Sequence, residues 1–282
     1  MGRVHRLTTT SWALVGSCHP VPSVAVTGFA VALGATAGNS ASTCATLGVA
    51  VLAGQLSIGW SNDRIDHDLD RNSSRTDKPL ARETVTLRTV DRAIAVALLV
   101  TVVGSLALGW RAGILHLVAV GCGWAYNLGL KATSISWLPY TVAFGSLPGV
   151  ATLARPSHAP PTAWAVGAGA LLGATAHLTN ALPDLIADQE FGIRGFPHRI
   201  GARPAVVLAA VASLAATALL VLGPAGSASP VRVAGLVVAS AWTLAGCALA
   251  WRRPQTPWLF YGTIAVVVID LALLMLGPSF VG

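Results

Sequence analysis

Residues 42–70 read STCATLGVAVLAGQLSIGWSNDRIDHDLD. Residues 42–60 carry no charge, whereas the nine residues from 62 to 70 hold four Asp. Only 11 of the 282 residues are acidic, so this crowding is not a matter of composition. An apolar run of about 20 residues has the length of a membrane-spanning helix. The stretch therefore predicts a helix that crosses a membrane and ends in a carboxylate-rich segment.

The composition of the whole chain agrees with a membrane protein. Hydrophobic residues make up 54 % of the chain and charged residues 10 %, and the mean hydropathy is +0.67. Soluble domains carry roughly 25 % charged residues. A nucleic-acid partner is not expected, because no basic stripe with interleaved aromatics lies outside the loops. The four Cys form no CxxC pair, which disfavours a zinc or redox site and favours inert core thiols.

Nine apolar segments are long enough to be spans, and together they predict an all-α polytopic membrane protein. They fall at about 21–38, 42–60, 93–110, 112–130, 136–153, 162–182, 204–222, 231–251 and 258–278. Several are rich in Gly and Ala, as in VGAGALLGATA, which permits close approach between membrane helices. We expect one domain over residues 1–282, with two four-helix halves after the first helix and cap loops at about 61–92 and 183–203.

The distribution of Lys and Arg predicts the orientation. The N-terminal tail, the two cap loops, Lys131 and the Arg252–Arg253 turn hold 15 of the 18 basic residues. Basic residues gather on the cytoplasmic side of membrane proteins. We therefore expect a multi-pass protein of the cell (plasma) membrane, with the N-terminus and both Asp-containing loops cytoplasmic and the C-terminus outside. The basic N-terminus is expected to be retained before the first span and not removed as a signal peptide.

Two Asp clusters have matched spacing. If the helix over 42–60 continues, Asn62, Asp66 and Asp70 lie four apart on one face, with Asp63 beside them. Asp68 is about 200° from Asp66 around the helix and should point elsewhere.

The second cluster follows the sixth apolar segment. Asn180, Asp184 and Asp188 are again spaced by four, and His177 lies one turn earlier. Pro183 is expected to kink the helix.

Opposed carboxylates of this kind would repel one another, and divalent cations relieve that repulsion. Oxygen-only ligands favour Mg²⁺, which completes its coordination with water and substrate phosphates. The pattern therefore predicts a phosphorylated substrate. The first cluster alone is also compatible with a solvated charged helix end, but the matched second cluster favours a metal site. A calcium-binding EF-hand is disfavoured, because the required Gly and the closing Glu are absent.

The motifs resemble the UbiA superfamily of intramembrane prenyltransferases. NDRIDHDLD is similar to the first signature of that family, NDxxDxxxD, and DLIAD to its second, DxxxD, here followed by FGIRG. RTDKPLA and YNLGLK resemble its segments after the first motif and the fourth span. The resemblance implies helices around a central chamber and the transfer of an isoprenyl group from an allylic polyprenyl diphosphate to a hydrophobic acceptor, with release of pyrophosphate.

The resemblance also implies roles for particular residues. One of two Mg²⁺ ions would bind Asn62, Asp63, Asp66 and Asp70, and the other Asp184 and Asp188. The diphosphate would contact Arg71, Lys78, Lys131 and Asn180. Catalysis would rest on Asp66, Asp184 and Lys131, and Tyr126, Asn127, His177 and Asp270 would line the chamber or support the site. The expected partners are the diphosphate, a small hydrophobic acceptor and the bilayer, with no obligate protein partner.

Some positions depart from the pattern and leave alternatives open. Ala132 follows Lys131 where benzoate-type members look dibasic, which weakens a benzoate acceptor and leaves another aromatic or quinone-precursor acceptor. Asp270 lies within a predicted span, where a carboxylate faces a cavity or a polar partner. Other interpretations are a terpene cyclase or lipid-phosphate transferase of the same fold, and, outside this class, a cation or metabolite transporter. A transporter would hold its site near the bilayer midplane, whereas these carboxylates lie at span ends.

Overall fold

The computed structural model describes residues 13–72, 80, 82, 84–190, 192–226, 228–254, 256 and 258–282, although the side chains of 69, 70, 72, 187 and 190 lie outside the description. Every regular element in these ranges is helical, apart from an isolated bridge between Pro161 and Val281. The long helices are α2 (Pro20–Thr36), α3 (Ala41–Ile65), α5 (Leu87–Ala107), α6 (Trp110–Asn127), α7 (Leu138–Leu153), α8 (Ala163–Ala181), α11 (Ala202–Leu222), α12 (Pro230–Arg252) and α13 (Trp258–Met275).

Each long helix coincides with one of the nine predicted apolar segments. Five of them, α3, α5, α11, α12 and α13, are long and apolar enough to cross a membrane. The all-α prediction is therefore confirmed, and the chain has the helices of a multi-pass membrane protein. The assignment of all nine helices as spans stays a prediction.

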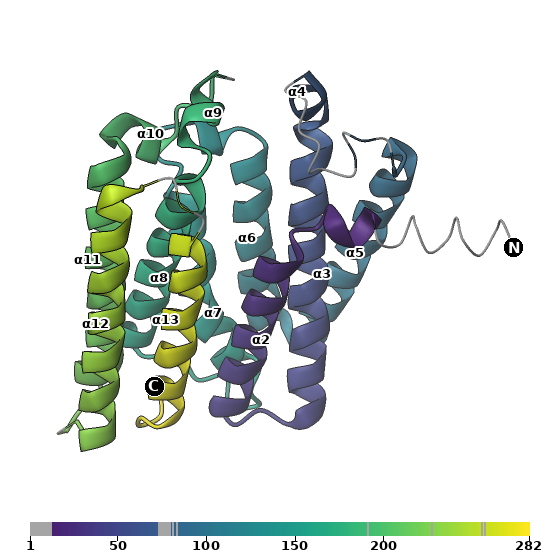
Figure 1. Ribbon diagram of the computed structural model, residues 1–282. Coiled ribbons are helices and arrows are strands. Elements are labelled where there is room, and N and C mark those ends of the chain that lie inside the picture. Colours follow the sequence, from purple (N-terminus) through teal and green to yellow (C-terminus); the bar gives the residue numbers. More distant parts are fainter. Residues whose placement is uncertain are drawn as a thin grey trace, which may run out of the picture.

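The long helices form a ring. Each one packs against the next in the chain, and α13 closes the ring against α2 (Figure 1). Helices α7 and α8 are closely packed, and Gly169 and Gly173 of α8 face the backbone of α7. A Cβ on Gly169 would lie 2.7 Å from the carbonyl oxygen of Phe144, and one on Gly173 would collide with that of Tyr140. The expectation that small residues permit close helix approach is confirmed at this interface.

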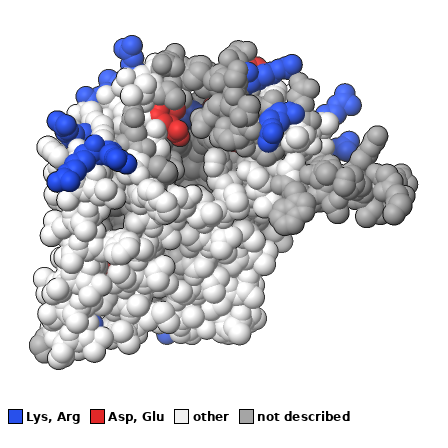
Figure 2. All heavy atoms as spheres, in the orientation of Figure 1, with Lys and Arg blue, Asp and Glu red and all other residues white. Residues whose placement is uncertain are grey.

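The two ends of the ring differ in character. The short helices α4 (His67–Asn72), α9 (Leu185–Glu190) and α10 (Phe196–Ile200) lie at one end, and the C-terminus lies at the other (Figure 1). Figure 2 shows Lys and Arg gathered at the end with the short helices, around a recess that contains acidic side chains. The side of the bundle below them is almost free of charge in this view, as expected of a surface that faces lipid.

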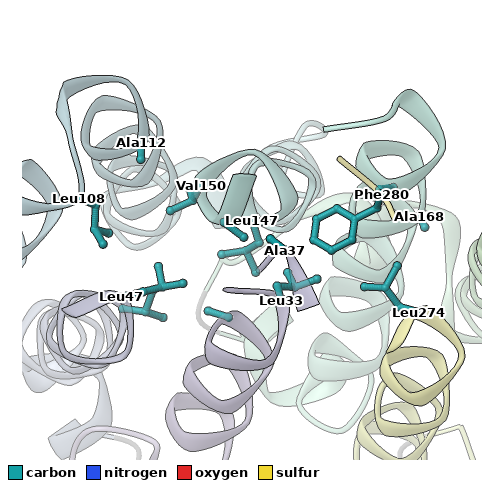
Figure 3. Packing of buried hydrophobic residues seen from close by; sticks show 14 of the residues in the cluster. Leu33, Ala37, Leu47, Leu108, Ala112, Leu147, Val150, Ala168, Leu274 and Phe280 are labelled. Atoms are coloured by element: carbon teal, nitrogen blue, oxygen red, sulfur yellow. The ribbon is translucent and has the colours of Figure 1, made fainter. Parts of the chain in front are cut away.

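The opposite half of the bundle is filled by a buried hydrophobic cluster. Figure 3 shows these side chains directed toward one another from α2, α3, α7, α8 and α13. Phe280, which follows α13, is fully buried within the cluster. Backbone hydrogen bonds fix the segment around it, because Thr162 N–H donates to the carbonyl of Phe280 at 2.8 Å and Gly282 N–H to that of Pro160 at 2.9 Å. The C-terminal segment thus closes this end of the bundle.

Candidate active site

The two Asp segments both lie at the charged end of the bundle (Figure 1). Asp66 and Asp188 lie near Tyr126 in α6, although the two residues are more than a hundred positions apart in the sequence. Tyr126 lies one residue before the last residue of α6. That the two clusters face a common volume stays a prediction.

Asp66 forms the closest ion pair of this region, with Lys131. Helix α3 ends at Ile65, and Asp66 is its C-cap, with its N–H bonded to the carbonyl of Asn62. Lys131, in the 3₁₀ turn η1 (Leu130–Ala132), donates to both carboxylate oxygens of Asp66 at 2.6 Å. Both side chains are largely buried, at 15 % and 14 % exposure. A short, partly desolvated pair of this kind is stronger than an exposed one.

The second Asp segment is not a continuous helix. Helix α8 ends at Ala181, a turn that contains Pro183 follows, and α9 starts at Leu185. Pro183 has no N–H to donate to the carbonyl of Thr179, so the helical hydrogen bonding ends here and the chain breaks where a kinked or loosened helix was expected. Asp184 lies half-buried in this turn, and its carbonyl accepts the N–H of Asp188 at 2.8 Å.

A histidine from outside each motif lies close to one of the Asp side chains. The Nε2 atom of His198 lies 3.5 Å from Asp188 Oδ2, and the His198 side chain is only 4 % exposed. The Nε2 atom of His19 lies 3.5 Å from Asp63 Oδ1, and Asp63 is buried within α3. Sequence reasoning missed both histidines, since neither lies within a recognisable pattern.

Ser136 connects the loop that carries Lys131 to the segment after the second motif. The Ser136 hydroxyl accepts the N–H of Phe196 at 2.8 Å and lies 3.1 Å from His177 Nε2. A hydroxyl both accepts and donates, so it is able to donate to that ring nitrogen. His177 is thus held as a structural link at 1 % exposure, in agreement with a supporting role.

An aromatic cluster lies beneath the two Asp segments. The ring centroids of Tyr126 and Tyr140 are 5.2 Å apart, and those of Tyr140 and His177 are 5.3 Å apart. Phe144 stacks on Tyr140 at 6.4 Å. The sequence contained one signal for this cluster: Tyr140 and Phe144 are four apart in the segment after Lys131 and so share a helix face. The contacts to Tyr126 and His177 depend on how α6, α7 and α8 pack.

The other predicted site residues fall into three groups. Asn62 is half-buried one turn before Asp66, on the same face. Arg71 and Asn180 are exposed, so Asn180 does not share the burial of His177. Asp68, to which the sequence assigned no role, is exposed as well. The side chain of Asp70 and the whole of Lys78 lie outside the described residues.

Asn127 ties α6 to the end of α3. Its amide nitrogen donates to the carbonyl of Ile58 and to the hydroxyl of Ser61, both at 2.8 Å, and the residue is 4 % exposed. Asn127 therefore fixes the part of α3 that directly precedes the first motif.

We expect Asn127→Leu to lower the free energy of unfolding by about 1–3 kcal/mol, because buried acceptors lose their donor. The thermal stability of the purified protein measures this loss. Asn39→Leu is a matched control at the opposite end of the bundle, where Asn39 donates to the carbonyls of Gly34 and Ala151. Both variants should lose stability, but only Asn127→Leu should also weaken binding of the diphosphate that the sequence motifs predict. Equal binding by the two variants would contradict the role of Asn127.

Asp270 lies far from this site. It is in the second half of α13, toward the C-terminal end of the bundle, at 1 % exposure. Neither carboxylate oxygen has a hydrogen-bond partner among the described residues. Its neighbour Thr217 donates its own hydroxyl to the carbonyl of Ser213 at 3.2 Å. Asp270 is therefore not a direct part of the Asp66–Asp188 site, and the hydroxyl of Thr217 lies beside its carboxyl group.

Solved structures of similar fold cover almost the whole chain. A UbiA homologue from Aeropyrum pernix K1, in its apo form, superposes with a TM-score of 0.73 at 18 % identity, over 90 % of this chain and 97 % of the other. A UbiA homologue from Archaeoglobus fulgidus, bound to GPP and Mg²⁺, gives 0.70 at 16 % identity, over 93 % and 99 %. A structure described as digeranylgeranylglyceryl phosphate synthase in membranes gives 0.63 at 14 % identity, over 96 % of both chains.

Comparison at the level of sequence places the chain in a family. No match is found among curated protein sequences. The profile of the UbiA prenyltransferase family matches residues 23–274, which include all the described site residues except His19. The match covers most of the chain and both Asp motifs, and the superposed structures have the same fold. The chain belongs to the UbiA prenyltransferase family.

Proposed function

We propose that this protein is a Mg²⁺-dependent prenyltransferase. It transfers the isoprenyl group of an allylic polyprenyl diphosphate to a hydrophobic acceptor, an aromatic or quinone precursor, and releases pyrophosphate. The observation that carries the proposal is the short, largely buried ion pair between Lys131 and Asp66 at the end of the first Asp motif. Family membership and the Mg²⁺- and GPP-bound relative support it.

The donor set fits Mg²⁺. The Asp66 carboxylate already accepts a cationic group on both oxygens, so it is oriented to bind positive charge. Among the described residues no three His, Cys, Asp or Glu side chains lie close enough together to hold a metal alone. Mg²⁺ needs only one or two carboxylates when phosphate oxygens complete its coordination. We propose that Asn62, Asp63, Asp66 and Asp70 would hold one ion, and Asp184 and Asp188 a second.

The chemistry begins with the departure of pyrophosphate. When bound, the Mg²⁺ ions would neutralise negative charge that develops on the leaving group. The Lys131 ammonium group would then leave the Asp66 carboxylate and donate its N–H groups to a diphosphate oxygen instead. Arg71, Lys78 and Asn180 are the further residues proposed to contact the diphosphate.

The aromatic cluster suits the cation that is left behind. The C–O bond breaks toward an allylic carbocation, and the faces of Tyr126 and Tyr140 attract positive charge through their quadrupoles. These rings and Phe144 also keep water from the cation. The acceptor captures the cation with an electron pair and loses a proton.

The proposed orientation follows from the two ends of the bundle. Basic residues and both Asp segments lie at one end and the C-terminus at the other (Figures 1 and 2). We propose that the charged end, with the N-terminus, faces the cytoplasm across the plasma membrane, following the positive-inside rule.

A terpene cyclase or a lipid-phosphate transferase of the same fold is the second candidate. The similarity in fold to digeranylgeranylglyceryl phosphate synthase favours testing a lipid acceptor. A transporter is disfavoured, since the described carboxylates around Tyr126 lie at one end of the ring and not at mid-height.

Labelled diphosphates distinguish these functions. The purified protein in nanodiscs is incubated with Mg²⁺ and labelled dimethylallyl or geranyl diphosphate, with and without an aromatic acid, a naphthol or a glycerol-ether phospholipid precursor. Acceptor-dependent release of pyrophosphate with a prenylated product is the expected result. A hydrocarbon or alcohol formed from diphosphate alone would identify a cyclase. If every labelled diphosphate stays intact and unbound, the proposal is wrong.

A further inference from the structure

His198 brings a nitrogen donor to the second Asp motif. The side chain of His198 is only 4 % exposed, and its Nε2 atom lies 3.5 Å from Oδ2 of Asp188. Neither ring nitrogen has a hydrogen-bond partner among the described residues. Buried polar side chains are nearly always hydrogen-bonded in native proteins. A buried imidazole that lacks such a bond and lies beside a carboxylate is therefore a candidate ligand for a bound cation.

The backbone holds these two side chains in place. The N–H of Ile193 donates to the carbonyl of Asp188 at 2.9 Å, which turns the chain back after α9. Helix α10 then begins at Phe196, whose N–H donates to the Ser136 hydroxyl at 2.8 Å, and it packs against α9 and α11. The position of the imidazole next to the carboxylate thus follows from the path of the chain and needs no hydrogen bond between the two side chains.

The distance between the two donor atoms fits a shared cation better than a hydrogen bond. An N–H···O hydrogen bond joins atoms that are about 2.7–3.2 Å apart, and the separation of 3.5 Å between Nε2 of His198 and Oδ2 of Asp188 exceeds this range. Two ligands of one tetrahedral cation, each about 2.1 Å from the metal, lie about 3.4 Å from each other. The observed separation agrees with this second value.

The chemistry of the pair favours a transition metal. Mg²⁺ prefers oxygen ligands, whereas an imidazole ligand favours Zn²⁺ and its neighbours in the first transition row. No group of three His, Cys, Asp or Glu side chains in the described part of the chain could hold a metal ion. Water or diphosphate oxygens would therefore complete the coordination of a cation held by Asp188 and His198.

We propose that Asp188 and His198 together bind a divalent transition-metal cation, and that the second Asp motif takes Mn²⁺ or Zn²⁺ in preference to Mg²⁺. The inference deepens the proposed function, on which the place of this cation in the reaction rests. The imidazole distinguishes this position from the first motif, where the Asp66 carboxylate is paired with the ammonium group of Lys131.

The nitrogen ligand is directly detectable with Mn²⁺ alone. Electron spin-echo envelope modulation is recorded on Mn²⁺ bound to the full-length protein in nanodiscs, without diphosphate. The wild-type protein should show the ¹⁴N modulation of a directly bound imidazole, and His198→Leu should lose it. The dissociation constant for Mn²⁺ should rise about tenfold or more in this variant, since even residues that only support metal ligands contribute about tenfold.

A competition experiment tests the preference for transition metals. Zn²⁺ should displace Mn²⁺ from the wild-type protein at a concentration at least about tenfold lower than Mg²⁺ does, because imidazole binds Zn²⁺ well and Mg²⁺ poorly. This difference should shrink in His198→Leu. The variant His198→Gln keeps a polar side chain in the buried position, and it should behave like His198→Leu.

His19→Leu is the matched control. The Nε2 atom of His19 also lies 3.5 Å from an Asp oxygen, Oδ1 of Asp63, but the His19 side chain is 50 % exposed. This variant should keep the ¹⁴N modulation. Loss of the modulation in His19→Leu, with retention in the His198 variants, would assign the nitrogen to the first motif and overturn the proposal.

The remaining outcomes separate this inference from the proposed function. Failure to bind Mn²⁺, or Mn²⁺ bound without ¹⁴N modulation, would overturn the cation site while prenyl transfer with Mg²⁺ is still observed. Displacement of Mn²⁺ by Mg²⁺ as readily as by Zn²⁺ would also overturn it. A nitrogen-coordinated Mn²⁺ in a protein that leaves every labelled diphosphate intact would contradict the proposed function and retain the site. The wild-type spectrum and the His19→Leu control decide the question even if the His198 variants do not fold.

Discussion

Asp66→Asn should reduce pyrophosphate release by about 10²–10³-fold or more, while the protein still inserts and folds. The amide keeps the shape of the side chain but removes the charge that is bound by Lys131 at 2.6 Å. It therefore also weakens any bond to a divalent cation at this position. A continuous pyrophosphate assay over a Mg²⁺ titration measures the effect, and size-exclusion chromatography in detergent confirms folding. The concentration of Mg²⁺ at half-maximal rate should rise.

Asp68 provides a matched control only two residues away. Its side chain is exposed, whereas Asp66 is half-buried and paired with Lys131. Asp68→Asn changes the net charge by the same amount and should keep the wild-type rate within about twofold, since surface charges contribute little. An equal loss in both variants would mean that the charge of the segment matters and not the position of Asp66.

Gly195→Ala should disturb the position of Lys131, although Gly195 is not itself a predicted site residue. A Cβ on Gly195 would collide with the carbonyl oxygen of Lys131 and lie 3.0 Å from Ser136 Oγ and 3.4 Å from His198 Nδ1. A backbone carbonyl moves only with its whole segment, so the added methyl group must displace the turn that carries Lys131. Overpacking of this kind costs about 1–3 kcal/mol. We expect a lower midpoint of thermal unfolding together with a rate reduced by about tenfold or more, because small misplacements of charged groups are costly in catalysis.

Gly28→Ala is the corresponding control. No atom lies within 4 Å of a Cβ added at that position of α2, and Ala favours a helix more than Gly does. This variant should be as stable as the wild type or slightly more stable, with unchanged turnover. A Gly195→Ala protein with wild-type stability and rate would refute the proposed contact between the segment after the second motif and the Lys131 turn.

The positions of the long helices were predictable, but their ends were not. Hydropathy marks the part of a helix that lies in apolar surroundings, whereas hydrogen bonds at the termini fix where the helix begins and ends. The predicted segment 42–60 extends to Ile65, because the polar residues that follow remain helical up to Asp66. The segment 93–110 begins earlier, at Leu87, because Thr86 caps the helix by accepting the N–H of Thr89.

The site was predictable as far as motifs and register allow. Asp68 is exposed and Asp66 is half-buried, but the expected continuous helix through the first motif was wrong, because α3 ends at Ile65 and α4 begins at His67. Lys131 lies beside Asp66, and the roles of these residues stay predictions. The partners that depend on tertiary packing were not accessible. His198 reaches Asp188 through the short helix α10, and Ser136 connects His177 with Phe196 across three segments. No local pattern encodes such contacts, since each depends on the path of a loop between two helices.

The pairing of Lys131 with Asp66 couples the two ligands of the proposed reaction thermodynamically. A divalent cation that arrives alone must compete with the ammonium group for the Asp66 carboxylate, and a diphosphate that arrives alone must draw Lys131 away from it. With both present, the Asp66 carboxylate would be free to hold the cation and the released Lys131 ammonium group would be free to donate to the diphosphate. Under the proposed function, each ligand would therefore raise the affinity of the other by the same factor, and the protein would bind the metal–diphosphate complex in preference to either component.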